Sequence, residues 1–221
     1  MRFDFDSANG ICTLAASDLL RGAGAPSLLR HVLSHADLKG VALRFEPSAD
    51  IESHPPATYQ ALWDLVSNAT VPVAASIRGA CQHASAGLTL ACHFRIALRD
   101  VAFSSPGLGL SLPPACLAVL AQQNALRKAL AEFVLSEHVI GADEALAVGL
   151  VDRVVEDDPD ATAVRYLESL VGNRPPRVVR AVMESIRNAR KLPREDALRK
   201  EAELFLKVVE QAMDADEAAT R

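Results

Sequence analysis

The sequence predicts an α/β fold, and three features of its 221 residues indicate this class. Compact apolar runs bounded by turn residues, such as Gly40–Phe45 and Val71–Ile77, are typical of buried strands. Segments with helical spacing of their apolar residues, such as Ser27–Ala36 and Ala57–Asn68, separate these runs. Two long amphipathic segments then close the chain, which predicts an all-helical C-terminal part behind an α/β core.

The first elements are expected to form a hairpin. Arg2–Asp6 alternates in polarity, Gly10–Ala15 is apolar, and Ala8-Asn9-Gly10 between them is typical of a turn. The helix over 27–36 and the strand over 40–45 follow. A loop with three prolines, Glu46–Pro56, then leads into the helix over 57–68.

The middle of the chain holds an unusual stretch of small residues, Ala84–Gly87, which is expected to open a short helix before the strand-like His93–Ala97. The remaining expected elements are listed in chain order: a strand at Ala102–Phe103, a loop at Ser104–Pro114, helix from Cys116 to Ser136, a helix at Asp143–Val148, a strand at Val151–Val155, and helices at Pro176–Ala189 and Arg194–Met213.

Composition limits the kinds of partner. The net charge of −5 argues against nucleic acid, because phosphate backbones bind basic surfaces. The four cysteines form no C-x-x-C pair, and no stretch approaches the length of a membrane span, so we expect a soluble cytoplasmic protein with reduced thiols. Cys81, His83, Cys92 and His93 do not have the spacing of a common zinc site, so no metal is expected.

The start of the short helix suggests what the backbone does there. A helix N-terminus presents N–H groups without intrahelical partners and carries a partial positive charge. Small residues such as those of Ala84–Gly87 let a ligand approach that backbone closely. The stretch therefore indicates a site where main-chain N–H groups stabilise a developing negative charge.

Four stretches in order resemble one family. Phe45–Ile51 (FEPSADI), Pro72–Ala97 (PVAASIRGACQHASAGLTLACHFRIA), Phe103–Pro114 (FSSPGLGLSLPP) and Gly141–Val155 (GADEALAVGLVDRVV) are similar to the corresponding blocks of the crotonase superfamily, the enoyl-CoA hydratase/isomerase family. The likeness runs from about Lys39 to Val155 and more weakly to about Glu217. It implies a spiral of ββα turns, residues 1–157, that binds acyl-CoA, and a helical trimerisation region, residues 158–221, that forms trimers or hexamers.

The resemblance also implies an activity and the residues that carry it. The family stabilises the enolate of an acyl-CoA thioester, and the two donors would here be the N–H groups of Ala49 and Ala84. Coenzyme A would arrive as part of the substrate, with no permanently bound cofactor. Asp50, Ile51 and Arg44 are the candidate residues for its binding.

Hydratases of the family use two glutamates, and glycines occupy both matching positions here, Gly87 and Gly107. Because glycine cannot move a proton, ordinary two-glutamate hydration is not expected. His83 and His54 are candidate replacement acids or bases, since histidine titrates near neutral pH. Two hypotheses follow: a lyase or isomerase of fatty acid metabolism with non-standard acid/base residues, or a catalytically inactive homologue that binds acyl-CoA or serves as an auxiliary subunit.

Overall fold

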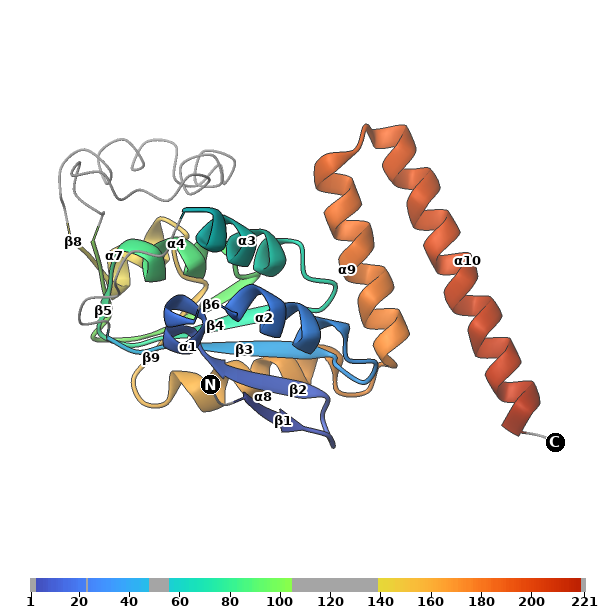
Figure 1. The fold of residues 1–221 in the computed structure, drawn as a ribbon, viewed down its shortest axis with the longest axis horizontal. Helices are drawn as coiled ribbons and strands as arrows, with labels where there is room; N and C mark the ends of the chain where they lie inside the picture. The colour runs from blue at the N-terminus through green and yellow to red at the C-terminus, as the bar shows by residue number, and fades with distance from the viewer. Residues whose placement is uncertain (1–2, 23, 48–55, 105–138, 220–221) are drawn as a thin grey trace.

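A computed structural model describes residues 3–22, 24–47, 56–104 and 139–219 of the chain (Figure 1). Its strands are β1 (Phe3–Asp6), β2 (Ile11–Ala15), β3 (Gly40–Phe45), β4 (Val73–Ile77), β5 (Ala80–Cys81), β6 (Phe94–Leu98), β7 (Ala102–Ser104), β8 (Val139–Gly141) and β9 (Arg153–Val155). Its helices are α1 (Ala16–Arg21), α2 (Ala25–Ser34), α3 (Pro56–Ser67), α4 (His83–Ala91), α7 (Ala142–Ala147), α8 (Pro159–Val171), α9 (Pro176–Lys191) and α10 (Arg194–Ala219).

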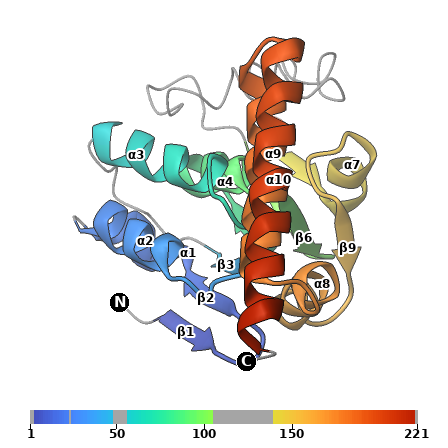
Figure 2. The same cartoon turned by 90° about the vertical axis from the view of Figure 1, so that its right-hand side faces the viewer.

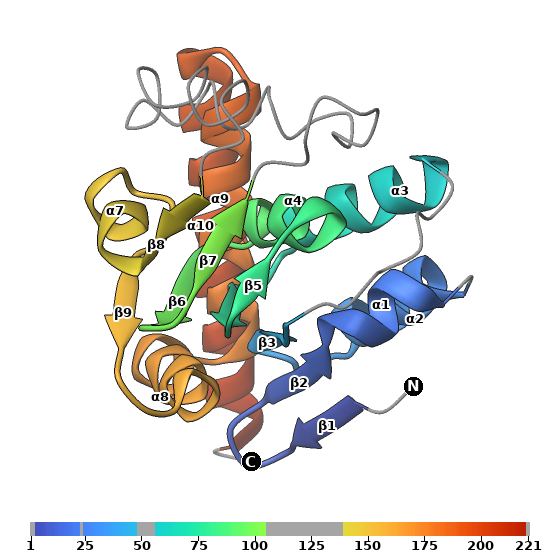
Figure 3. The same cartoon turned by 90° about the vertical axis from the view of Figure 1, so that its left-hand side faces the viewer.

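Six strands form the main sheet, in the order β1-β2-β3-β4-β6-β9. β1 pairs with β2 antiparallel, which confirms the predicted hairpin, and every later pair in this sheet is parallel. Parallel neighbours need crossover connections: helices α1 to α4 lie in those from β2 to β6, and α7 lies in the connection from β6 to β9. A smaller sheet, β5-β7-β8, lies beside α4 and α7 (Figure 3). The predicted α/β class is confirmed.

Both faces of the main sheet are covered, which explains why its central strands read as continuous apolar runs. Helices α1 to α4 lie on one face, and α8 lies on the other (Figure 1). Alternate residues of the central strands face α8, where Ala42, Ala74 and Ile96 pack with Ala163 and Leu167. The other residues of these strands join the larger core under α1 to α4.

The C-terminal helices divide into two groups. α8 follows the predicted boundary at residue 157 and packs on the sheet, where its N-terminus is capped by Asp158. α9 and α10 instead form a hairpin that stands beside the sheet, with α10 on the outside (Figures 1 and 2). Arg180 fastens α9 to the body of the molecule by donating to the carbonyl oxygens of Leu33 and His35 and to the hydroxyl of Thr70.

The predicted elements agree with the structure to within a few residues wherever they lie in its described part. The short elements α1, β5 and β8 were not expected, because two to six residues give too little periodicity to recognise. The 13-residue helix α8 was not expected as a separate element either, although the chain after residue 157 was predicted to be helical. The loop predicted at Ser104–Pro114 and the helical stretch from Cys116 to Ser136 lie outside the described residues, apart from Ser104 at the end of β7.

Candidate functional site

A cavity of about 230 Å³ lies at the carboxyl edge of the main sheet. Three segments line it: α1 with Ala16, Ser17 and Arg21, the end of β3 with Phe45, Glu46 and Pro47, and the first turn of α4 with Ser85. They meet because β2, β3 and β4 are parallel and in register, so the residues that follow each strand emerge at one edge. In α/β sheets this edge is where ligands bind.

The first turn of α4 contributes Ser85 to the lining of this cavity. Gln82 is the N-cap in an extended conformation, and its carbonyl accepts hydrogen bonds from the N–H groups of Ser85 (3.1 Å) and Ala86 (3.2 Å). Ala84, the second helical residue, precedes the cavity-lining Ser85. Its N–H belongs to the first turn, where a helix supplies no carbonyl partner. Ala84 is half-buried, and Ser85 and Ala86 are buried.

Tyr59 fixes the position of this turn. Its hydroxyl, on α3, donates a hydrogen bond of 3.2 Å to the carbonyl oxygen of Ala84. Only 4% of Tyr59 is exposed, so the bond forms away from bulk water, where hydrogen bonds are stronger. The start of α4 is therefore held by a neighbouring helix as well as by its own cap.

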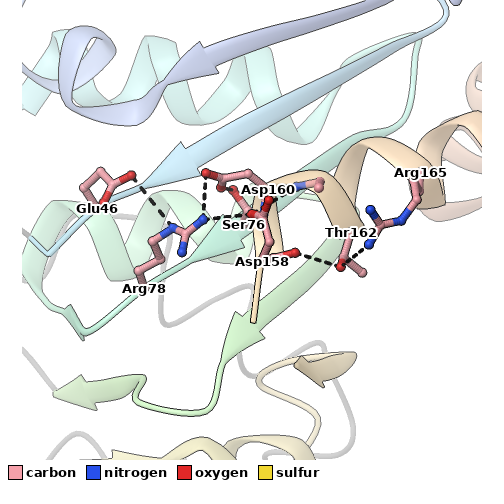
Figure 4. A network of polar contacts seen from close by, with 8 residues as sticks. Glu46, Ser76, Arg78, Asp158, Asp160, Thr162 and Arg165 are labelled. Atoms are coloured by element: carbon pink, nitrogen blue, oxygen red, sulfur yellow. Dashed lines mark hydrogen bonds and ion pairs between the residues drawn. The ribbon is translucent and has the colours of Figure 1, made fainter. Parts of the chain in front are cut away.

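The end of β3 is held by a network of polar side chains (Figure 4). Arg78, just after β4, donates to the carboxylates of Asp158 (2.9 Å) and Asp160 (3.0 Å), and its Nε lies 4.0 Å from Glu46. The buried hydroxyl of Ser76, on β4, also donates to the carboxylate of Asp160. The hydrogen bond with Asp160 raises the pKa of Arg78, so this guanidinium stays charged and links Glu46 at the cavity to Asp158 and Asp160 at the start of α8.

Gly79 also shapes this edge. Its φ of 55° lies in the left-handed region that favours glycine, and a Cβ there would come within 2.7 Å of the ring of Pro47. The close approach places the residues after β3 directly against those after β4.

The predicted site residues fall into two groups. Ala49, Asp50, Ile51, His54 and Gly107 lie outside the described residues, although Pro47 brings the chain to the cavity two residues before Ala49. His83 is the first residue of α4, so its backbone is at the site, but its side chain is not among those described.

The other two predicted residues are described. Gly87 is buried in the second turn of α4, and Arg44 is exposed near the end of β3, paired with Ala15 and Ser76. Two cavity-lining groups were missed in the sequence, Arg21 and Glu46. Arg21 was missed because it lies in α1, which is too short to recognise in the sequence. Glu46 could have been found, because it is the first charged residue after the predicted strand Gly40–Phe45.

The thiols do not contribute a reactive group in the described part of the chain. Burial raises the pKa of Cys12 to about 11 and the pKa values of Cys81 and Cys92 to about 12, so these thiols stay protonated. Cys116 lies outside the described residues. In the described ranges, no group of three His, Cys, Asp or Glu side chains gathers closely enough to hold a metal ion. No helix there is both long and apolar enough to cross a membrane.

Comparison with known proteins gives the same family as the sequence blocks. The family model for enoyl-CoA hydratase/isomerase matches residues 34–219. The chain is 28% identical over 220 residues to the peroxisomal bifunctional enzyme of Homo sapiens, covering 96% of this chain and 30% of that protein. It is 30% identical over 164 residues to carnitinyl-CoA dehydratase of Escherichia coli, covering 74% of this chain and 61% of that one. The chain thus spans under a third of the length of the peroxisomal bifunctional enzyme and about three-fifths of the length of carnitinyl-CoA dehydratase.

The fold is similar to the crystal structure of enoyl-CoA hydratase from Thermoplasma volcanium. The TM-score is 0.76, at 18% sequence identity, and the match covers 99% of this chain and 96% of that one. This similarity confirms the crotonase-type fold that the four sequence blocks implied.

Proposed function

Because the chain belongs to the enoyl-CoA hydratase/isomerase family, we propose that it binds an acyl-CoA thioester and stabilises its enolate through backbone N–H groups. The donors are those of Ala49 and Ala84. The observation that carries the proposal is the cavity formed by the end of β3 and the first turn of α4. Ala84 precedes Ser85 of its lining, and Ala49 follows Pro47 by two residues.

The chemistry needs charge stabilisation above all. Removing a proton next to the thioester carbonyl places negative charge on its oxygen, and a preorganised N–H donor stabilises such an oxyanion by about 3–4 kcal/mol. The partial positive charge at the start of α4 adds to this effect. Tyr59 and the Gln82 cap hold the turn in place, so little reorganisation is needed during the reaction.

Proton transfer then falls to groups other than the usual glutamate pair. Gly87 has no side chain to offer, and Gly107 is the other glycine at a glutamate position of the family. Glu46 is a carboxylate that lines the cavity, with Arg78 close by to orient it. We propose that Glu46 carries the proton together with His83 or His54, giving a lyase or isomerase reaction of fatty acid metabolism.

Coenzyme A is proposed to enter as part of the substrate, with no cofactor bound permanently. Arg21 in the cavity and Arg44 near the end of β3 are cations at the same sheet edge, suited to its phosphates. Asp50 and Ile51 would complete the binding loop after Pro47.

Turnover of a panel of crotonyl-, branched-, aromatic- and malonyl-CoA thioesters by the purified chain tests this proposal. Ala84→Pro removes one N–H in the first turn of α4, and because proline also disfavours the helical conformation of His83 before it, thermal melts must show that the variant still folds. Turnover should fall by about 100-fold or more, while calorimetry should show unchanged affinity for free CoA, which has no thioester carbonyl. A84P with undiminished turnover would refute the oxyanion site. Three further variants, Glu46→Gln, His83→Ala and His54→Ala, identify the group that carries the proton. The variant that loses turnover lacks that group.

An inactive homologue is the second candidate, favoured by the buried Gly87 within α4. On that reading the chain binds acyl-CoA or assists an active partner. Tight CoA binding with no turnover of any thioester supports it over the enzyme.

We further propose that residues 158–221 assemble the chain into a cytoplasmic homotrimer or hexamer. Large apolar side chains remain exposed along α9 and α10, among them Leu198 (55%), Leu206 (63%) and Met213 (62%). Such patches mark protein interfaces. Light scattering should give three or six times the 23.6 kDa of one chain, and Leu206→Glu should shift the mass toward the monomer. The buried thiols of Cys12, Cys81 and Cys92 suit a reducing compartment.

A further inference from the structure

A second, smaller cavity lies at the other end of α4. It has a volume of about 40 Å³ and lies between α3, the turn before β6, and α9. Its lining includes Asn68, His93, Met183, Arg187, Arg190 and Lys191. One water needs about 10–15 Å³ of such space, so the cavity has room for about three or four oxygen atoms of a bound group.

Positive charge surrounds this cavity. Arg187, Arg190 and Lys191 come from the last turns of α9, and the nearby acid is Glu184, 3.4 Å from Arg187. Arg187 and Lys191 also donate to the backbone and side-chain oxygens of Asn68, which are neutral acceptors, so among the described ion pairs Glu184 alone offsets the charge of these three cations. Arg190 has no hydrogen-bond or ion-pair partner among the described residues. The cavity therefore attracts an anion.

His93 adds a neutral donor to these cations. Its Nδ1 accepts a hydrogen bond of 3.1 Å from the N–H of Val73, so the ring proton resides on Nε2. Burial, Arg190 and Arg95 lower its pKa to about 4. The ring that lines the cavity is thus uncharged near neutral pH and keeps an N–H to donate.

We propose that this cavity binds a phosphate group, held by Arg187, Arg190 and Lys191 and by the imidazole N–H of His93. The ligand is inorganic phosphate or the terminal phosphate of a phosphomonoester, both of which offer clustered anionic oxygens to arginine and lysine. The site is separate from the thioester cavity. The two cavities share no lining residue, and they lie at opposite ends of α4, whose nine residues span about 13 Å.

Calorimetric titration of the full chain with inorganic phosphate tests this site. We expect Arg190→Ala to weaken binding by about tenfold, because Arg190 is exposed and has no described contact whose loss would unfold the chain. Arg199→Ala is the matched control, since it removes a similarly exposed arginine from α10, and its affinity should equal that of the unchanged chain. Equal phosphate affinity in R190A and the unchanged chain overturns the proposal.

Further titrations distinguish free phosphate from a phosphomonoester as the ligand, and this cavity from the thioester cavity as the binding site. A titration with AMP in place of phosphate shows whether a monoester is the better ligand. Saturating CoA should leave phosphate affinity unchanged, whereas loss of phosphate binding in its presence would assign these cations to the thioester site. Phosphate should also raise the pKa of His93 in an NMR titration, since a nearby anion favours the charged ring, and an unmoved pKa would contradict the proposal. None of these readouts depends on thioester turnover.

Discussion

The hydroxyl of Tyr59 and the carbonyl oxygen of Ala84 are joined by a hydrogen bond of 3.2 Å that ties α3 to the first turn of α4. The two residues come from different crossover connections of the sheet, and both precede buried strands. The bond therefore links the packing of the core to the position of the proposed oxyanion donor.

Tyr59→Phe removes this bond and keeps the ring. We expect the free energy of unfolding to fall by about 1 kcal/mol, the usual net worth of one hydrogen bond, and thioester turnover to fall with it because the turn is less well held. Urea denaturation and steady-state kinetics measure the two effects. Tyr166→Phe is the control, because the Tyr166 ring packs against Phe94 and its hydroxyl has no partner in the described part of the chain. Equal stability of Y59F and Y166F would show that the bond contributes nothing.

Arg180→Ala should loosen the α9–α10 hairpin. The guanidinium makes three hydrogen bonds, to Leu33 and His35 at the end of α2 and to Thr70 before β4, and the variant loses all three. We expect a loss of about 2 kcal/mol or more in unfolding free energy and faster proteolysis of the C-terminal helices. Arg165→Ala on the exposed side of α8 should change stability little, and a similar loss in both variants would contradict this assignment.

His93 should make stability depend on pH. Its pKa is about 4 in the folded chain and 6.5 in the unfolded chain, so the unfolded state binds the extra proton between these values. The contribution is complete above pH 6.5 and is lost as pH falls toward 4. Between pH 7 and pH 5 it amounts to about 2 kcal/mol.

His93→Asn preserves an acceptor for the Val73 N–H without the titration. In urea denaturation, the difference in unfolding free energy between pH 7 and pH 5 should shrink by about 2 kcal/mol in this variant. An unchanged difference would assign the pH dependence to other groups.

Asp158 combines a helix cap with an ion pair. Its carboxylate accepts from the N–H groups of Asp160 and Ala161 and pairs with Arg78, and these interactions, led by the Ala161 bond, lower its pKa. Asp158→Ala should cost about 1 kcal/mol, whereas Asp158→Ser restores the cap and should recover most of it. Thermal melts of the two variants measure the difference. If serine performs no better than alanine, the ion pair dominates over the cap.

Most of the long elements could be predicted from the sequence because their apolar residues recur with a clear period, and α8 is the exception, since it was predicted only as part of a helical C-terminal region. Gly40–Phe45 was predicted with the bounds that the structure has, and the start of α9 was predicted at Pro176. α9 and α10 continue past their predicted ends, since exposed polar residues in a helix leave no apolar mark of where it stops.

The cavity could not be predicted, because its lining combines residues of three elements that are far apart in the sequence: the short helix α1, the end of β3 and the first turn of α4. Ala84 was identified from its small neighbours and from resemblance. Arg21 and Glu46 became apparent only when β2, β3 and α4 were brought to one edge. The basic cavity of α9 was missed for the same reason, because His93 and Arg190 are distant in sequence.

The hairpin strand β1 has a consequence for the behaviour of the protein in concentrated solution. Among the described residues no strand pairs with its outer edge, and the charged Asp4 and Asp6 of this strand are exposed. β9, at the opposite margin, is only three residues long. The carboxylates of β1 and the short length of β9 both discourage a strand of a second molecule from pairing with the sheet. We therefore expect little tendency toward fibril growth.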